Sequence, residues 1–270
     1  MKRFSALLMC VLMGLMLLVS GCGSDKPAQG AQGGDSAGIK AIKDRGVLKV
    51  GVKVDVPKFG FKDPQTNQID GMEIDLARAI AKKVLGDASK VEVQGVTAKT
   101  RGPLLDNGEV DLVIATFTIT DERKKSYNFS EPYFTDGVGM MVKKSSGMEA
   151  LKDMNGKKIG VAQSATSRKA LQAEADKVGA KVQFLEFGTY PEIKTALDSG
   201  RVDVFSVDGS ILSGYLDDST VILKDRYAPQ QYGVASKKDN TALAKVVDET
   251  IADMKKGGEL DQLIQKWGIK

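Results

Sequence analysis

Residues 70–86 read DGMEIDLARAIAKKVLG, and this stretch predicts an amphipathic helix. Its apolar residues recur at helical spacing and form one stripe: Ile74, Ala77, Ile80, Ala81, Val84 and Leu85. Asp70 and Glu73 have the spacing of a capping box, and Gly86 suits the position after the last turn. The β-branched run at 47–54, with LKVGV at its centre, predicts a strand before this helix.

The same alternation of strands and helices continues along the chain. Further strands are predicted at 91–96, 110–115, 158–162, 181–187 and 202–207, and further helices at 103–106, 167–178, 191–197, 242–255 and 259–267. Such alternation predicts an α/β protein with mostly parallel sheets and helices on both faces. The sequence contains no GxGxxG or GxxxxGK[ST] loop, which argues against a nucleotide-dependent enzyme.

Two extended stretches, 137–144 and 230–237, interrupt this order and predict two crossings between lobes. We expect lobe one to comprise 39–136 plus 233–270, and lobe two to comprise 137–232. Paired crossings make a hinge, and ligands of α/β proteins collect at the carboxyl ends of strands. The site is therefore expected in a cleft between the lobes.

The N-terminal residues have the features of an export signal. Lys2 and Arg3 precede an apolar run at 6–19, which is shorter than the roughly 20 residues that span a bilayer. The run ends in VSGC, which resembles a lipobox, so we expect a signal peptide at 1–21 and a lipid on Cys22. Residues 22–38 then predict a flexible tether. The alternative is an ordinary secretory signal with a chance cysteine. The chain is expected to be exported and anchored to the outer face of the cytoplasmic membrane or on the periplasmic side.

Composition excludes several kinds of chemistry. The chain has no histidine, which excludes Ser-His-Asp and Cys-His catalysis and histidine-bound metals. Its two cysteines, Cys10 and Cys22, lie in the N-terminal segment, so no disulfide framework is expected beyond them. A formal charge of +4 is weak support for nucleic-acid binding. We therefore expect no catalytic residues, metal, cofactor or nucleic-acid partner.

Four motifs carry a family resemblance. The segments GMEIDLARAIAKKV, DLVIATFTITDERKKSYNFSEPYF, KIGVAQSAT and GRVDVFSVD occur in this order along the chain. From about residue 46 to residue 270, the chain resembles the bacterial extracellular solute-binding proteins of family 3, which are polar amino-acid receptors of ABC importers. The resemblance implies the type II periplasmic-binding-protein fold. AKTRGPLLDNG and the segment around YPEIK look most similar to aspartate- and glutamate-binding members.

The resemblance implies a set of residues for the α-amino-acid group. Arg123 matches the arginine that grips the α-carboxylate, for which a planar donor fork is well suited. Thr116 and Thr118, at alternate positions after an apolar strand, match hydrogen-bonding positions of lobe one. Thr166 contributes a hydroxyl from lobe two, and Asp208 matches the aspartate that binds the ammonium. Read without the family, these residues are a solvated arginine, strand threonines, a helix N-cap and a turn aspartate.

Three further residues match the side-chain end of the ligand. Lys53 and Arg101 match positions that face this end in acidic-amino-acid members, and Tyr190 adds a hydroxyl from lobe two. Two cations there favour a second carboxylate. The plainer alternatives are a surface lysine and a helix-start arginine. Asp55 lies near the mouth of the site in some members. The sequence does not separate aspartate from glutamate, because one methylene is worth only about 1–3 kcal/mol.

We therefore expect a non-catalytic, monomeric receptor that binds an acidic amino acid and delivers it to the permease and ATPase subunits of an importer. A receptor for a neutral polar amino acid such as glutamine is one alternative. An enzyme similar to the cyclohexadienyl dehydratases is another, although their glutamate acid would stand where this chain has Asp208. A sensor domain is a third.

Overall fold

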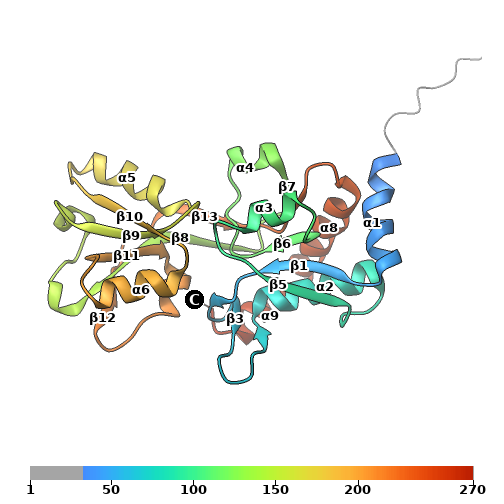
Figure 1. The fold of residues 1–270 in the computed structure, drawn as a ribbon, viewed down its shortest axis with the longest axis horizontal. Coiled ribbons are helices and arrows are strands. Elements are labelled where there is room, and N and C mark those ends of the chain that lie inside the picture. Colours follow the sequence, from blue (N-terminus) through green and yellow to red (C-terminus); the bar gives the residue numbers. More distant parts are fainter. Residues whose placement is uncertain (1–32, 270) are drawn as a thin grey trace, which may run out of the picture. The chain divides into compact units, whose positions relative to one another are not determined.

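A computed structural model of the chain describes residues 33–269. The predicted signal peptide, Cys22 and most of the predicted tether lie outside these residues. The described helices are α1 (Gly33–Arg45), α2 (Met72–Leu85), α3 (Arg101–Asp106), α4 (Asp121–Ser126), α5 (Ser167–Lys177), α6 (Tyr190–Asp198), α7 (Gly209–Ser213), α8 (Thr241–Gly257) and α9 (Glu259–Lys266), with 3₁₀ turns at Lys144–Ser146 and Leu151–Met154. Six of them, α2, α3, α5, α6, α8 and α9, correspond to helices that the sequence predicts, whereas α1, α4 and α7 were not predicted (Figure 1).

The first sheet has the strand order β5 (Val91–Gly95), β1 (Leu48–Val52), β6 (Leu112–Ile114), β14 (Ala235–Lys237) and β7 (Tyr127–Phe129). Strand β1 runs parallel to β5 and β6, whereas β14 is antiparallel to both of its neighbours. Side chains alternate between the two faces of β6, as strand geometry requires. Leu112 and Ile114 join the core with α2, whereas Val113 packs with Leu105 of α3 on the other face.

The second sheet has the order β10 (Gln183–Phe187), β9 (Lys158–Ala162), β11 (Val204–Asp208), β8 (Phe134–Lys143) and β12 (Thr220–Ile222), and β13 (Tyr227–Tyr232) also pairs with β8. Val138, Met140 and Val142 of β8 pack on the side of α5, and Met141 packs on the side of α6. A small third sheet joins β2 (Asp55–Val56), β3 (Gly60–Lys62) and β4 (Ile69–Asp70). The α/β class and the two-sheet architecture of the type II fold are confirmed.

The chain passes between the two large sheets along β8 and β13. Phe134 pairs with Tyr232 and Asp136 pairs with Gln230, so the two crossings lie side by side in an antiparallel ladder. The sequence placed the first crossing at 137–144, but most of that range is a strand of the second sheet. The apolar residues of β8 are buried on both faces of the sheet, and the sequence of this range is therefore almost continuously hydrophobic.

The N-terminus of α2 differs from the expected capping box. The helix begins at Met72, with Gly71 as its N-cap and no side-chain cap. The Met72 and Glu73 amides donate instead to the carbonyls of Lys58 (2.8 Å) and Phe59 (2.9 Å). Gly71 has φ 149°, and a Cβ there would lie 2.1 Å from the Phe59 oxygen. The capping-box prediction is wrong, because a neighbouring loop supplies the acceptors and leaves the Glu73 side chain free for another role.

The end of α2 agrees with the sequence prediction, whereas the start of α1 does not. Gly86 ends α2 in the left-handed conformation that the sequence predicts, and its amide donates to the Lys82 carbonyl at 2.9 Å. Helix α1 begins at Gly33, inside the range 22–38 that the sequence predicts as a tether. Ile42 of α1 is buried in the core, and α1 packs against α8. This packing supports a helix whose early residues have no apolar signal of their own.

Candidate functional site

The ends of three strands bring predicted site residues to one place. Lys53 follows β1, Thr116 lies two residues after β6, and Asp208 is the last residue of β11. All three are buried, with 1%, 3% and 4% of their surface exposed. Arg101 and Tyr190, the first residues of α3 and α6, are also buried and interact electrostatically with Asp208. The carboxyl ends of strands are where ligands of α/β proteins bind, as the sequence analysis expected.

Arg123 connects the two halves of the site. Its Nη1 donates to the Thr118 carbonyl at 2.7 Å, and its Nη2 donates to the Ser164 carbonyl at 3.0 Å. Its guanidinium carbon lies 4.6 Å from the centre of the Phe117 ring, which also contacts Arg101 at 4.1 Å. Burial and the neighbouring Arg101 lower the pKa of Arg123 to about 9. The group is therefore a partly desolvated cation that an anionic ligand would stabilise.

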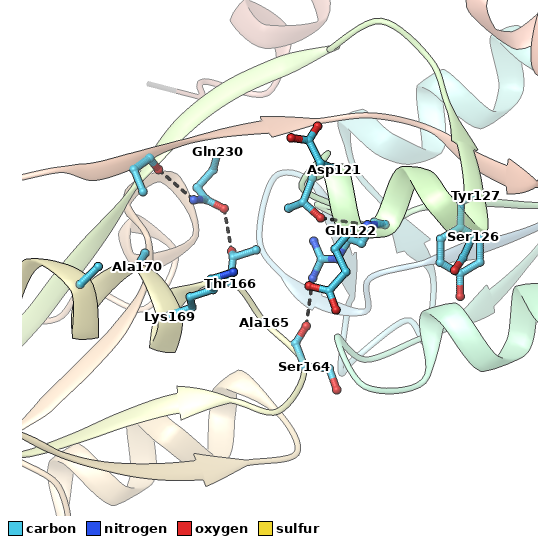
Figure 2. Close-up of a pocket in the computed structure, with 14 residues that line it drawn as sticks. Asp121, Glu122, Ser126, Tyr127, Ser164, Ala165, Thr166, Lys169, Ala170 and Gln230 are labelled. Carbon is cyan, nitrogen blue, oxygen red and sulfur yellow. Dashed lines mark hydrogen bonds between the residues drawn. The ribbon is translucent and has the colours of Figure 1, made fainter.

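Thr118 and Thr166 share one acceptor that the sequence analysis missed. The Thr118 hydroxyl donates to Gln230 Oε1 at 2.9 Å. The Thr166 hydroxyl donates to the same oxygen at 2.7 Å (Figure 2). Gln230 is 3% exposed, and its Nε2 donates to the Ala228 carbonyl. Thr166 precedes α5 but its side chain does not cap that helix. One sequence signal could have identified Gln230 as a site residue: it is a polar residue within the predicted crossing at 230–237.

Thr116 takes a conformation that strand geometry does not predict. Strand β6 ends at Ile114, and Thr116 has φ 44°, which is uncommon for a β-branched residue. Thr116 and Thr118 were predicted to face the same side because they alternate along a strand. That reasoning does not apply here, since both lie beyond the end of β6, although both are buried. The Thr116 amide donates to Glu73 Oε1 at 2.6 Å, and its hydroxyl oxygen is buried without a hydrogen-bond partner.

Asp208 has one oxygen engaged and one free. Its Oδ2 accepts a hydrogen bond from the Tyr232 hydroxyl at 2.5 Å, whereas Oδ1 is buried without a partner. Burial raises the pKa of Asp208 to about 7, although the hydrogen bond from Tyr232 opposes this rise. Asp203, interpreted as structural, accepts a hydrogen bond from the Lys158 amide at 2.8 Å. A free buried carboxylate oxygen is suited to an ammonium donor.

Lys53 is paired with a carboxylate rather than left as a free cation. Its Nζ lies 2.9 Å from Asp55 Oδ1 and 4.6 Å from the centre of the Tyr190 ring. Burial lowers the pKa of Lys53, and Asp55 opposes this effect. The Tyr190 amide donates to Asp55 Oδ2 at 3.4 Å, and the Tyr215 hydroxyl donates to the Asp55 carbonyl. Asp55, which the sequence placed only near the mouth, is central to this side of the site.

A groove of about 780 Å³ adjoins the buried cluster (Figure 2). It lies between α4 and α5, and Arg123, Thr166 and Gln230 line it, whereas Lys53, Arg101 and Asp208 do not. The groove therefore reaches only part of the predicted site. Within residues 33–269, no group of three or more acidic or cysteine side chains is arranged to hold a metal ion. The same part of the chain contains no helix long and apolar enough to cross a membrane.

A family comparison decides what kind of protein carries this site. The model of the bacterial extracellular solute-binding proteins, family 3, matches residues 48–270. The chain belongs to this family. It is therefore an extracytoplasmic solute-binding protein, as the four sequence motifs indicated.

The printed names of two relatives give the ligand that each of them binds. The chain is 37% identical to the ABC transporter glutamine-binding protein GlnH of Bacillus subtilis (strain 168), covering 99% of this chain and 97% of that protein. It is also 37% identical to the glutamine-binding protein of Geobacillus stearothermophilus, covering 93% and 100%. Both names give glutamine, the neutral amino acid that was the alternative ligand, rather than an acidic amino acid.

Solved structures agree on the fold. An ancestral arginine-binding protein bound to glutamine is 38% identical, with a TM-score of 0.74, and the match covers 83% of this chain and 98% of that one. An ancestral amino-acid-binding protein described as a precursor of cyclohexadienyl dehydratase is 32% identical, with a TM-score of 0.75, covering 85% and 98%. Both glutamine-binding relatives are named as binding proteins, one of them of an ABC transporter, which supports a binding protein rather than an enzyme.

Proposed function

We propose that this protein is the receptor of an amino-acid ABC importer and that it binds L-glutamine at the buried cluster between its two sheets. The observation that carries the proposal is the Lys53–Asp55 ion pair, 2.9 Å long, at the side-chain end of the site. An ion pair offers a donor and an acceptor together. A carboxamide needs both, because its oxygen accepts and its nitrogen donates.

The α-amino-acid group is assigned to the residues that the sequence analysis named. The Arg123 guanidinium holds the α-carboxylate, assisted by the Thr118 and Thr166 hydroxyls from the two sides of the site. Asp208 holds the ammonium through the oxygen that has no partner in the structure. Thr116 lines the same region with an unpartnered hydroxyl oxygen. Unpartnered buried polar atoms cost free energy, and a ligand that supplies their partners recovers it.

The side-chain group is assigned to Lys53, Asp55, Arg101 and Tyr190. The expectation of an acidic ligand rested on the resemblance to aspartate- and glutamate-binding members and on the cations Lys53, Arg101 and Arg123, counted without their neighbours. The structure places three buried or half-buried carboxylates, those of Asp55, Glu73 and Asp208, among these cations. The formal charges of these six groups cancel, so a zwitterion with a neutral side chain adds no net charge to them. An acidic amino acid carries a second carboxylate and a net charge of −1, so it leaves one uncompensated charge, which is costly in a buried site.

Glutamate is the second candidate, and one observation favours it. Arg101 Nε is buried and has no acceptor, although Nη1 donates to the Ala115 and Thr116 carbonyls. A side-chain carboxylate would supply a charged acceptor for this group. The amide is preferred because its oxygen also supplies an acceptor, without adding a charge.

Calorimetric titration with glutamine, glutamate, asparagine and aspartate tests the proposal. We expect glutamine to bind most tightly, and tightest binding of glutamate would contradict the carboxamide assignment. The Asp55→Asn variant removes the negative charge beside Lys53 while keeping the side-chain size. It should lower the affinity for glutamine and improve the relative affinity for glutamate by about 10-fold or more, because Lys53 then lacks its counter-charge. Asp218→Asn, at an exposed position, is the matched control.

The enzyme alternative is tested separately. Asp208 is shorter than the glutamate acid expected in the cyclohexadienyl dehydratases, and it lies against Tyr232. We expect no turnover of prephenate or arogenate by the purified protein. Measurable dehydration of either compound would contradict a receptor role. Delivery to permease and ATPase subunits is tested by glutamine uptake in cells that lack this protein, with and without complementation.

A further inference from the structure

Glu73 is a buried carboxylate that the proposed ligand contacts do not use. It is the second residue of α2 and has no exposed surface. Its position near a helix N-terminus is favourable for a negative charge, but its own oxygens do not cap that helix. A wholly buried carboxylate costs free energy unless other groups compensate it, so its neighbours indicate its role.

One oxygen of Glu73 holds the backbone of Thr116, next to the proposed ligand contacts. Oε1 accepts hydrogen bonds from the Tyr133 hydroxyl at 2.5 Å and from the Thr116 amide at 2.6 Å. The carbonyl of Thr116 accepts in turn from Arg101 Nη1 at 3.0 Å. The same residue is thus held by Glu73 on its amide side and by Arg101 on its carbonyl side. This arrangement holds Thr116 at φ 44° and orients the Arg101 guanidinium.

The other oxygen of Glu73 is available for electrostatic compensation. Oε2 is buried and makes no hydrogen bond. Burial raises the pKa of Glu73, and Lys53 and Arg101, the two cations of the side-chain subsite, both oppose this rise through their electrostatic interaction with the carboxylate. Asp55 pairs with Lys53 directly, whereas Arg101 contacts only carbonyls and the Phe117 ring among its described close partners. Asp55 balances the charge of Lys53, and Glu73 is therefore positioned to balance the charge of Arg101.

We propose that Glu73 is a positioning residue that sets the side-chain preference of the receptor, by orienting Arg101 through Thr116 and by offsetting the positive charge of the side-chain subsite. This inference rests on the proposed function and deepens it. It predicts that the preference for an amide over the matching acid depends on a residue that does not touch the ligand.

The Glu73→Gln variant separates charge from geometry. The glutamine oxygen still accepts from Tyr133 and Thr116, whereas the negative charge is lost. Calorimetry with glutamine and glutamate should show the affinity ratio moving toward glutamate by about 10-fold or more. Tyr133→Phe is the matched control, since it removes one hydrogen bond to the same oxygen without changing any charge. We expect Tyr133→Phe to lower the melting temperature and to leave the affinity ratio within about 3-fold of the native value.

Glu73→Asp supplies a second variant in case Glu73→Gln does not fold. Aspartate keeps the charge but shortens the reach to Thr116, so both affinities should fall while their ratio changes little. An unchanged ratio in Glu73→Gln, or a ratio that shifts equally in Tyr133→Phe, would overturn the inference. So would a Glu73→Asp ratio that moves toward glutamate. If the native protein binds another acid and amide pair instead of glutamine, the proposed function fails, but the ratio for that pair still tests Glu73.

Discussion

The hydroxyl of Thr166 donates its proton to the side-chain oxygen of Gln230 at 2.7 Å, on the strand that crosses between the sheets. Thr118, on the other side of the site, donates to the same oxygen. A hydroxyl has one proton, so neither threonine can donate to Gln230 and to a ligand carboxylate at the same time. The side-chain oxygen of Gln230 therefore occupies the two hydroxyls that a ligand carboxylate would use, and a ligand must compete with Gln230 for them.

Replacing Gln230 should consequently release both hydroxyls. The Gln230→Met variant keeps the size of the side chain and removes the acceptor. Because a neutral hydrogen bond is worth about 1 kcal/mol, we expect the ligand to bind up to about 10-fold more tightly. Gln231→Met, at the adjacent exposed position, is the control and should bind as the native protein does. Weaker binding by Gln230→Met in calorimetry would show that the amide assists the ligand instead.

Arg123 should be irreplaceable by lysine. Its guanidinium donates in two directions, to the carbonyls of Thr118 and Ser164, and lies against Phe117. Lysine keeps the charge but not the planar fork or the stacking. We expect Arg123→Lys to lower the affinity for every amino acid by about 10-fold or more, because one of the two charge-assisted hydrogen bonds to the α-carboxylate is lost, at a cost of about 1.5–3 kcal/mol. Lys124→Ala, which alters an exposed neighbour, should leave the affinity unchanged. A selective loss for one ligand would contradict the α-carboxylate assignment.

Binding should release a proton below neutral pH. Burial raises the pKa of Asp208 to about 7 in the protein without ligand, so the group is largely protonated at pH 6. A ligand ammonium favours the ionised form, so the proton leaves on binding and the affinity falls as pH falls. Between pH 7.5 and pH 5.5, we expect a loss of about 10-fold or more. Titrations in two buffers of different ionisation enthalpy measure the released proton. In Asp208→Asn the remaining affinity should not depend on pH in this range, and a retained dependence would assign the proton to another group.

Folding stability should depend on the same group in the opposite direction. A carboxyl whose pKa is higher in the folded than in the unfolded protein makes the unfolded form the stronger acid. The free energy of unfolding therefore decreases as pH rises from about 4 to about 7, as far as Asp208 contributes. A saturating ligand should abolish this decrease. Thermal unfolding of the native protein and of Asp208→Asn, each with and without glutamine, measures both effects.

Lipid attachment at Cys22 remains a prediction from the sequence, since this residue lies outside the described part of the chain. Cys22→Ser should release the protein from the membrane fraction of the expressing cells, and mass spectrometry of the native protein should find a diacylglycerol-modified cysteine at its N-terminus. Cys10→Ser is the matched control, because Cys10 lies in the predicted signal peptide. Equal membrane association of both variants would contradict the anchor.

Most of the fold could be predicted from periodicity alone. The helix at Ser167–Lys177 and the strand at Lys158–Ala162 were predicted to within one residue, because local spacing of apolar residues determines which face can be buried. The capping box at Asp70 and Glu73 was wrong for a non-local reason. Carbonyls of Lys58 and Phe59 satisfy the first turn of α2, and no local pattern reveals that loop.

The sequence by itself determined the α/β class, the family and the list of polar residues that follow strands. These depend on local spacing and on motifs that are contiguous in the chain. Only the tertiary structure decided which charges face one another. It pairs Lys53 with Asp55, places Glu73 below Thr116 and Arg101, and joins Thr118 and Thr166 through Gln230. Electrostatic energy depends on distance and burial rather than on order along the chain. The resemblance and a count of cations therefore predicted an acidic ligand, whereas the proposed assignment of glutamine also takes the neighbouring carboxylates into account.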